Sequence, residues 1–322
     1  MAYQAGDTIL DDEYNTFANN SSSPFGWNHF AGTGSGQYGL GESAISTVSA
    51  GGTVQASQWN TLFTNMSTIA GHTGDTLTSR SAVNAGDTIA IKAAVATDLA
   101  TLAASVAAGC PSTSAVSTSA TLQAPASNST WTGTFTTEVT ATFASADAMR
   151  FFFNAGGKIR LDPIRVGNGG ASGASGKDGN WDNLNNAVGN LDIASQASTR
   201  SGSGETLTTN GLANGFYDLG TSYTTLLKLT DDTYPYTANT IEIQAKLNAS
   251  AGSSTSITVK TIATDGASDY TFDSGNPGGA DTQAYRNGQH QHRLISIDTT
   301  TGGGLANAYA PSSTSSTVVS AG

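Results

Sequence analysis

The chain has 322 residues, a formal net charge of −11 at pH 7 and charged residues at only 11% of its positions, where a typical soluble protein has about a quarter. Nucleic-acid-binding proteins normally carry a basic patch. Here Arg80 and Lys92 are the only basic residues before Arg150, so we expect no direct binding of DNA or RNA. The single cysteine, Cys110, excludes an internal disulfide, and no Cys/His spacing suggests zinc.

A short motif recurs three times in the first third of the chain. Ala5–Ile9 (Ala-Gly-Asp-Thr-Ile) returns as Ala50–Val54 and again as Ala85–Ile89. The first two copies continue, at the same offset, with an aromatic-Asn pair (Tyr14-Asn15 and Trp59-Asn60), which the third copy lacks. The small residues suit a turn, and apolar residues at helical spacing follow each motif. Because one such unit cannot bury its apolar face alone, we expect a repeated turn-helix region that serves assembly.

The helix expected after the second motif is the most regular of the three. Ser57 is its predicted N-cap and Gly71 its predicted end, and its apolar residues form an amphipathic stripe. Packing between the sister helices is the favoured interpretation of the stripe, and docking of a partner is the alternative. In either case we expect the region to supply an assembly interface, formed by Tyr14, Phe17, Trp59, Leu62, Phe63 and Met66.

The period of the apolar residues changes to two after Trp131, which predicts strands. Met149–Phe153 and Lys158–Leu161 flank an Asn-Ala-Gly-Gly segment, a pattern typical of a β-hairpin. A short helix around Trp181 is expected next, and the last third alternates as strands. The predicted strands are 131–143, 223–229, 241–247, 257–259 and 294–297.

These elements predict an α+β fold in four parts. Residues 1–110 form the turn-helix repeats, and residues 111–130 form a Ser/Thr/Ala-rich linker. Residues 131–298 form an antiparallel, jelly-roll-like β-sandwich. Residues 299–322 show no amphipathic pattern, so we expect an extended C-terminal arm. The start of the chain shows no signal peptide, and the Ala90–Ala108 stretch is too polar for a membrane span, so we expect no membrane partner and synthesis in a cytoplasm.

Two features are candidate metal sites, each with a plainer interpretation. His290 and His292 would project from the same side of a strand, but no third ligand is near in sequence, and a polar strand end accounts for them. Acidic residues of the Gly-rich 265–281 loop offer oxygen ligands for calcium, but their spacing fits no EF-hand, and a solvated loop is favoured. These residues are Asp265, Asp269, Asp273 and Asp281. We expect no bound metal and no cofactor.

Catalysis and sugar binding have less support. Ser195 and Ser201 lack a nucleophile-elbow pattern, and nothing marks Asp147 and Asp162 as an acid/base pair, so we expect no enzymatic activity and no catalytic residues. Several aromatic residues with polar neighbours suit sugar faces, but they suit protein interfaces better. They are Trp27, Tyr38, Tyr217, Tyr234 and Tyr236.

The order of several segments resembles virion structural proteins of tailed bacteriophages, especially fibre, tail and neck components of marine and cyanobacterial phages. The segments are the repeated motifs with Tyr14-Asn15 and Trp59-Asn60, Gly32–Gly41, Met149–Arg160, Gly179–Trp181 and Tyr236–Ile243. The resemblance implies a structural component of a tail, baseplate, neck or fibre, located in the virion. We expect a homo-oligomer, a trimer or hexamer, that contacts other virion proteins. The alternative is a receptor-binding module that recognises a host glycan. In some trimeric phage spikes a His-x-His from each chain binds iron on the axis; for His290 and His292 to resemble that site, a three-fold axis would have to pass at their strand.

Overall fold

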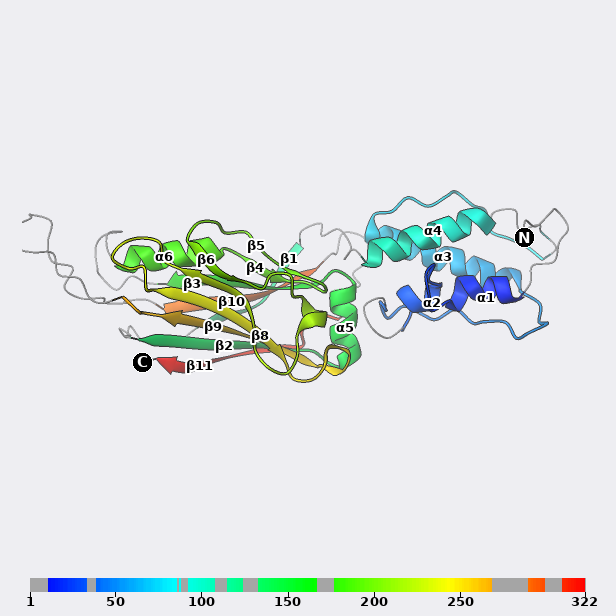
Figure 1. Cartoon of the computed structure of the whole chain (residues 1–322). Helices are drawn as coiled ribbons and strands as arrows, with labels where there is room; N and C mark the ends of the chain where they lie inside the picture. The colour runs from blue at the N-terminus through cyan, green and yellow to red at the C-terminus, as the bar shows by residue number, and fades with distance from the viewer. Residues whose placement is uncertain are drawn as a thin grey trace, which may run out of the picture. The chain divides into compact units, whose positions relative to one another are not determined.

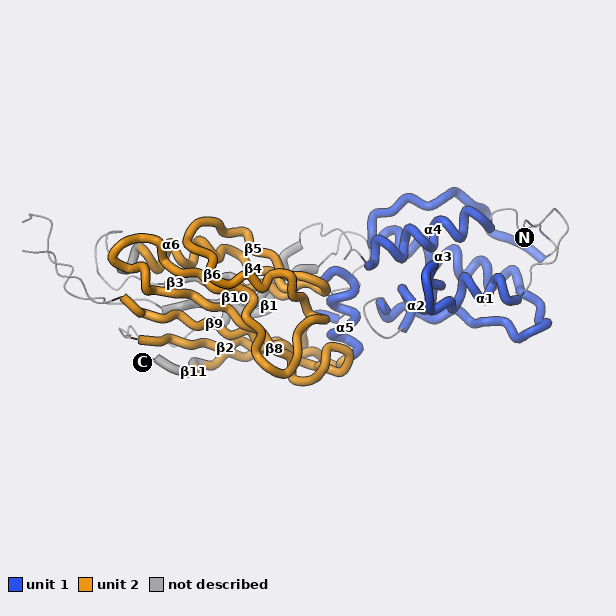
Figure 2. Tube along the Cα trace, viewed as in Figure 1, with its two compact units in different colours: residues 1–115, 147–157, 298–310 blue, residues 116–146, 158–297, 311–322 orange. Residues whose placement is uncertain are grey.

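The computed structural model combines helices with antiparallel sheets (Figure 1), which confirms the predicted α+β class. It describes residues 11–33, 39–85, 87, 92–107, 115–123, 133–166, 177–267, 289–298 and 309–321. The chain divides into two compact units (Figure 2). Unit 1 comprises Met1–Ala115, Asp147–Gly157 and Asp298–Ala310, and unit 2 comprises Val116–Ala146, Lys158–Ile297 and Pro311–Gly322.

Unit 1 is helical in its described part. Its elements are α1 (Asp11–Asn19), α2 (Trp27–Phe30), α3 (Ala56–Thr73), α4 (Lys92–Ala107) and α5 (Ala146–Asn154). Helices α1, α3 and α4 begin with the same order of buried and exposed positions over nine residues, and the fourth, seventh and eighth positions are buried in each. The sixth position is Thr in all three (Thr16, Thr61 and Thr97), and its hydroxyl donates to the backbone carbonyl four residues earlier.

The ends of α3 differ from the prediction. Gln55, and not Ser57, is the N-cap, because Gln55 and Gln58 form a reciprocal capping box in which Gln58 Oε1 accepts from Gln55 N at 2.8 Å. The helix continues through Gly71 and ends at Gly74, which has φ 79° and donates from its N–H to Ala70 O. A left-handed glycine in this place satisfies a terminal carbonyl and stops the helix, whereas Gly71 lies in the helical interior.

The hairpin predicted around residues 149–161 is also wrong in its first half. Ala146–Asn154 forms helix α5, and only Lys158–Val166 forms a strand, β3. Met149, Phe152 and Phe153 are fully buried at i, i+3 and i+4, so helical spacing prevails over the strand preference of consecutive Phe residues. Gly156 (φ 87°) then ends the helix by donating from its N–H to Phe153 O.

The described part of unit 2 contains two sheets. The six-stranded sheet has the order β11-β2-β9-β8-β7-β6, and the five-stranded sheet has the order β1-β10-β3-β4-β5. Every pairing that the structure describes is antiparallel. Besides β3, the strands are β1 (Ala115–Gln123), β2 (Thr134–Thr142), β4 (Leu191–Ile193), β5 (Ser198–Arg200), β6 (Thr206–Asn210), β7 (Thr224–Thr230), β8 (Thr240–Leu247), β9 (Ser256–Thr264), β10 (Gln289–Asp298) and β11 (Ser313–Ala321). The helical segments of this unit are α6 (Lys177–Val188), η1 (Phe216–Asp218) and η2 (Ala251–Ser253).

Two of these strands lie in stretches for which the sequence predicts no strand. β1 lies in the stretch predicted as a linker, residues 111–130, and β11 lies in the stretch predicted as an extended arm, residues 299–322. β11 pairs with β2 from Ser313↔Thr142 to Ala321↔Phe135. Its described side chains are nearly all exposed. A strand that buries no face shows no alternation of apolar and polar residues, which is why its sequence resembles a coil.

The core of unit 2 follows the alternation that the sequence predicts for β8 and β9. Ile241, Ile243, Ala245 and Leu247 of β8 are buried and stand opposite the buried residues of β9. Helix α6 packs against β3, β7 and β8, and Trp181, Leu184 and Val188 on this helix are fully buried. β6 to β9 are consecutive along the chain and adjacent in one sheet, so they form a meander.

Candidate functional site

The six residues predicted to form an assembly interface lie in the interior of unit 1. Tyr14, Leu62 and Met66 are fully buried, Trp59 is 2% exposed, and Phe17 and Phe63 are 8% exposed. The Trp59 ring lies 5.5 Å from that of Tyr14 and 5.8 Å from those of Phe17 and Phe63. These edge-on and tilted contacts are those that aromatic rings prefer in cores. The six side chains therefore hold the helices of one chain together and leave almost no area for a partner.

The asparagine of each aromatic-Asn pair fixes the segment that leads into the next copy of the motif. Asn15 donates from Nδ2 to Val48 O at 2.7 Å and accepts from Val48 N at 2.8 Å. Asn60 forms the same two bonds with Val83, at 2.9 Å each. Val48 and Val83 stand two residues before the second and third motifs. One amide thus replaces a strand partner for one residue and satisfies both of its backbone groups.

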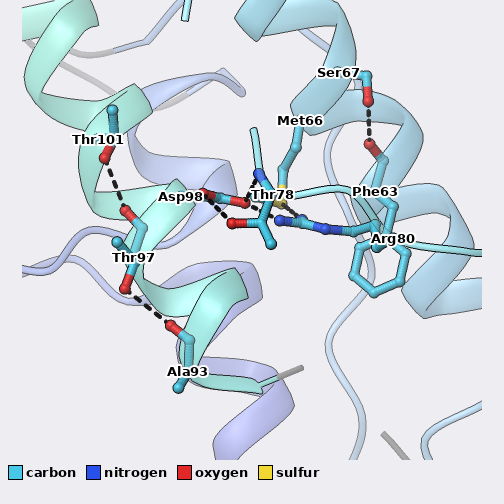
Figure 3. A network of polar contacts seen from close by, with 9 residues as sticks. All are labelled: Phe63, Met66, Ser67, Thr78, Arg80, Ala93, Thr97, Asp98 and Thr101. Carbon is cyan, nitrogen blue, oxygen red and sulfur yellow. Dashed lines mark hydrogen bonds and ion pairs between the residues drawn. The ribbon is translucent and has the colours of Figure 1, made fainter. Parts of the chain in front are cut away.

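Helix α4 carries an ion pair (Figure 3) at a position where helices α1 and α3 have an apolar residue. Asp98 takes the place of Phe17 and Leu62 in the shared burial order and forms a salt bridge with Arg80, each side chain being 8% exposed. The carboxylate also accepts from Thr78 N at 3.0 Å and from Thr78 Oγ1 at 3.2 Å. The Arg80 guanidinium lies 5.1 Å from the Phe63 ring centroid. This network joins α4 to the segment that follows α3.

Three carboxylates meet at one end of the β6–β7 pair. Glu205 precedes β6, Asp231 and Asp232 follow β7, and one oxygen of each lies within 4.8 Å of the others. Asp231 is 2% exposed, Glu205 is half-buried, and Asp232 is exposed. Glu205 Oε2 accepts from Asp232 N and Asp231 Oδ1 accepts from Thr233 N, both at 2.8 Å. Oxygen donors in such an arrangement can bind a hard cation.

The electrostatics of this acidic cluster oppose ionisation. Burial raises the pKa of Asp231, and the nearby charge of Asp232 raises it further. Burial also raises the pKa of Glu205, and the charges of Asp231 and Asp232 add to the effect. Among the described residues, no Lys or Arg forms an ion pair with any of the three.

The sequence does not predict this acidic cluster. Glu205 and Asp231 are 26 positions apart, and neither belongs to a known metal-binding spacing. The only signal is indirect: each lies beside a short Thr-rich strand, and antiparallel pairing with the right register is needed to bring them together. Register cannot be read from β6, whose five residues are all exposed, because register is weakly specified where neither face is buried.

The other predicted candidates are dispersed. The backbone register places His290 and His292 on β10, opposite Arg165 and Pro163, while their side chains lie outside the description. Asp269, Asp273, Asp281 and Tyr38 also lie outside the described residues. Residues with clear structural roles include Ser201, which accepts from Asn190 N, and Asp147, which pairs with Arg150. Of the predicted sugar-binding aromatic residues, Trp27 and Tyr236 are buried, Tyr217 is half-buried and Tyr234 is 77% exposed.

Within the described part of the chain, no helix has both the length and the apolar character that crossing a bilayer requires. Comparisons of the chain with family models, with curated proteins and with solved structures found no match.

Proposed function

We propose that the chain is a structural subunit of a phage particle, a component of its tail, baseplate, neck or fibre, and that it acts through contacts between copies of itself and with other virion proteins. The resemblance of its ordered motifs to those of virion proteins supports a place in a phage particle. The two edges of the six-stranded sheet support the mode of contact, and this is the observation on which the proposal rests.

Both edges of this sheet lack the charged residues and prolines that usually prevent pairing. β6 and β11 contain no charged residue and no proline, and each pairs on one side only among the described residues. Leu207 on β6 and Val319 on β11 are 38% and 54% exposed. An edge strand presents unpaired N–H and C=O groups, which natural monomers protect with Lys, Pro or bulges. A register shift interrupts each ladder once, but β11 pairs without interruption from Ser313 to Val318.

The position of the two edges defines the kind of assembly. They lie on opposite sides of the same sheet, so β11 of one copy beside β6 of the next is a heterologous contact. Contacts of this kind close into a ring when the rotation allows, and otherwise extend as a filament. A trimer or hexamer is such a ring. In this proposal the three helices with one burial order are successive turn-helix repeats, while the jelly-roll-like arrangement of the two sheets stays a prediction.

Analytical ultracentrifugation of the full chain tests the proposal. Thr317→Lys on β11 combined with Leu207→Lys on β6 adds a charge to each edge, and a charged edge strand resists pairing. We expect the wild-type chain to sediment as an oligomer and the double variant as a monomer. Gly220→Lys combined with Ser253→Lys is the matched control, because both residues are exposed and lie outside the strands. A wild-type monomer at all concentrations, or an oligomer that the edge variant retains, contradicts edge pairing.

The receptor-binding alternative has one specific observation in its favour. Tyr234 is 77% exposed and stands two residues after Asp232, so it is an exposed aromatic residue with polar sequence neighbours, a combination that suits the face of a sugar. A glycan array probed with the full chain and with Tyr234→Ala tests it. Binding that the substitution abolishes supports glycan recognition, whereas an array without signal contradicts it and favours the assembly role.

A further inference from the structure

The β6–β7 register brings like charges together at one end of the sheet. Thr206↔Thr230 is the last pair of this ladder, so Glu205 and Asp231 are the next residues on their strands, and Asp232 follows. Like charges that stand opposite each other across a strand pair are destabilising. A cation that binds between these carboxylates would therefore stabilise the folded state.

A buried oxygen in this cluster has no partner. Asp231 Oδ1 accepts from Thr233 N, but Asp231 Oδ2 is enclosed by protein and forms no hydrogen bond. Asp231 is 2% exposed, and one of its carboxylate oxygens belongs to the group of oxygens that lie within 4.8 Å of one another. A buried carboxylate is normally paired or bound to a metal. A water molecule would satisfy the hydrogen bond of Asp231 Oδ2 but would bring no positive charge to a cluster that pairs with no Lys or Arg among the described residues.

We propose that Glu205, Asp231 and Asp232 form a calcium site. Two oxygens bound to one Ca²⁺ at about 2.4 Å are at most about 4.8 Å apart, which is the limit that these three carboxylates meet. Asp232 is exposed, so water can complete the outer side of the coordination shell. Ca²⁺ accepts irregular shells of carboxylate oxygens, whereas Mg²⁺ needs near-octahedral geometry and Zn²⁺ prefers nitrogen and sulfur ligands.

The geometry favours a cation over the acid/base chemistry of glycosidases. Retaining glycosidases have carboxylates about 5–5.5 Å apart and inverting enzymes about 6.5–9.5 Å apart, so that sugar or water fits between them. Here the oxygens are closer than that, and Asp231 is enclosed by protein. Bound calcium would cross-link the first residue before β6 to the loop after β7 and thereby hold the edge strand in place. The site does not depend on the proposed particle function.

Isothermal titration calorimetry and thermal unfolding of the full chain, after removal of metals with a chelator, test the site with CaCl₂ as the probe. We expect one calcium per chain with a dissociation constant of about 10⁻⁴ M, in the range of extracellular modules. A hundredfold excess of Ca²⁺ over that constant should raise Tm by about 5–10 °C. MgCl₂ at the same concentration should produce at most a small part of this shift.

Glu205→Gln and Asp232→Asn should each weaken calcium binding at least tenfold, and both residues are exposed enough to be changed without opening the core. Asp231→Asn should abolish binding, with circular dichroism to show that the variant folds. Asp12→Asn is the control, since it removes a negative charge from an exposed residue of α1, in the other unit. The proposal is overturned if the wild type shows no calcium heat and no Tm shift, if Mg²⁺ acts equally, or if Glu205→Gln and Asp232→Asn both bind calcium as the wild type does.

Discussion

The buried ion pair between Arg80 and Asp98 offers the sharpest test of how unit 1 is held together. Asp98 occupies a core position on α4, accepts hydrogen bonds from Thr78 and pairs with Arg80, and both charged side chains are 8% exposed. We consider Asp98→Leu, Arg80→Met and the double variant. The equivalent positions of α1 and α3 hold Phe17 and Leu62, so a leucine at this place has two precedents within the chain.

The expected magnitudes follow from desolvation. Asp98→Leu leaves the Arg80 guanidinium buried without its carboxylate, and losing one member of a buried pair costs about 3–5 kcal/mol. Arg80→Met leaves the Asp98 carboxylate with Thr78 alone and should cost a similar amount. Replacing both removes both charges, and such apolar replacements are often neutral or stabilising. We therefore expect the double variant to be destabilised by less than about 1 kcal/mol, far less than the sum of the single variants.

Urea unfolding followed by circular dichroism at 222 nm measures these differences, since the helices of unit 1 dominate the signal. With a urea m-value of about 2 kcal/mol/M, a loss of about 4 kcal/mol moves the midpoint down by about 2 M. Each single variant should show this shift, and the double variant should return near the wild-type midpoint. Additive single effects, or single variants within about 0.5 kcal/mol of the wild type, would refute the reasoning.

Two further predictions concern unit 1. Asn60→Asp keeps the acceptor for Val83 N but loses the donor to Val83 O, so it should lower the free energy of unfolding by about 1–2 kcal/mol; Asn60→Ala, which loses both bonds, should lower it further, and equal values for the two variants would argue against a two-point contact. His72 is 4% exposed, its Nε2–H donates to Ala155 O, and burial lowers its pKa from 6.5. Burial disfavours the charged form of His72 in the folded state, so the unfolded state takes up the proton first as the pH falls. The free energy of unfolding is therefore undiminished above pH 6.5 and decreases below it, by up to about 1.4 kcal/mol per pH unit. His72→Gln should flatten the stability profile between pH 7 and 5.5, and an unchanged slope would contradict this assignment.

Elements with one buried face could be predicted from the sequence because burial imposes a period. The stripe of α3 and the alternation of β8 and β9 show this directly, and all three elements form where the sequence predicts them, although the ends of α3 differ. Prediction failed where a local preference competed with packing. Met149–Phe153 has the composition of a strand, yet its buried residues recur at helical spacing, and only the fold decides between the two.

Where no face is buried, the sequence carries little information. β11 has almost no buried described side chain, so its pairing with β2 leaves no pattern in the sequence. The acidic cluster could not be predicted for the same reason, because its three residues meet only through the register of an exposed strand. The buried stripe of α3 was visible, but its partner was not: amphipathic spacing shows that a face is covered and does not distinguish a sister helix from another chain.

Hydrogen exchange of backbone amides in the full chain, measured at increasing protein concentration, tests the central claim most directly. If copies join through the edges of the six-stranded sheet, amides in Thr206–Asn210 and Ser313–Ala321 should become protected as the oligomer forms, while the buried helices of unit 1 stay unchanged. Protection of both edges that is independent of concentration, in a chain that sediments as a monomer, would contradict the account.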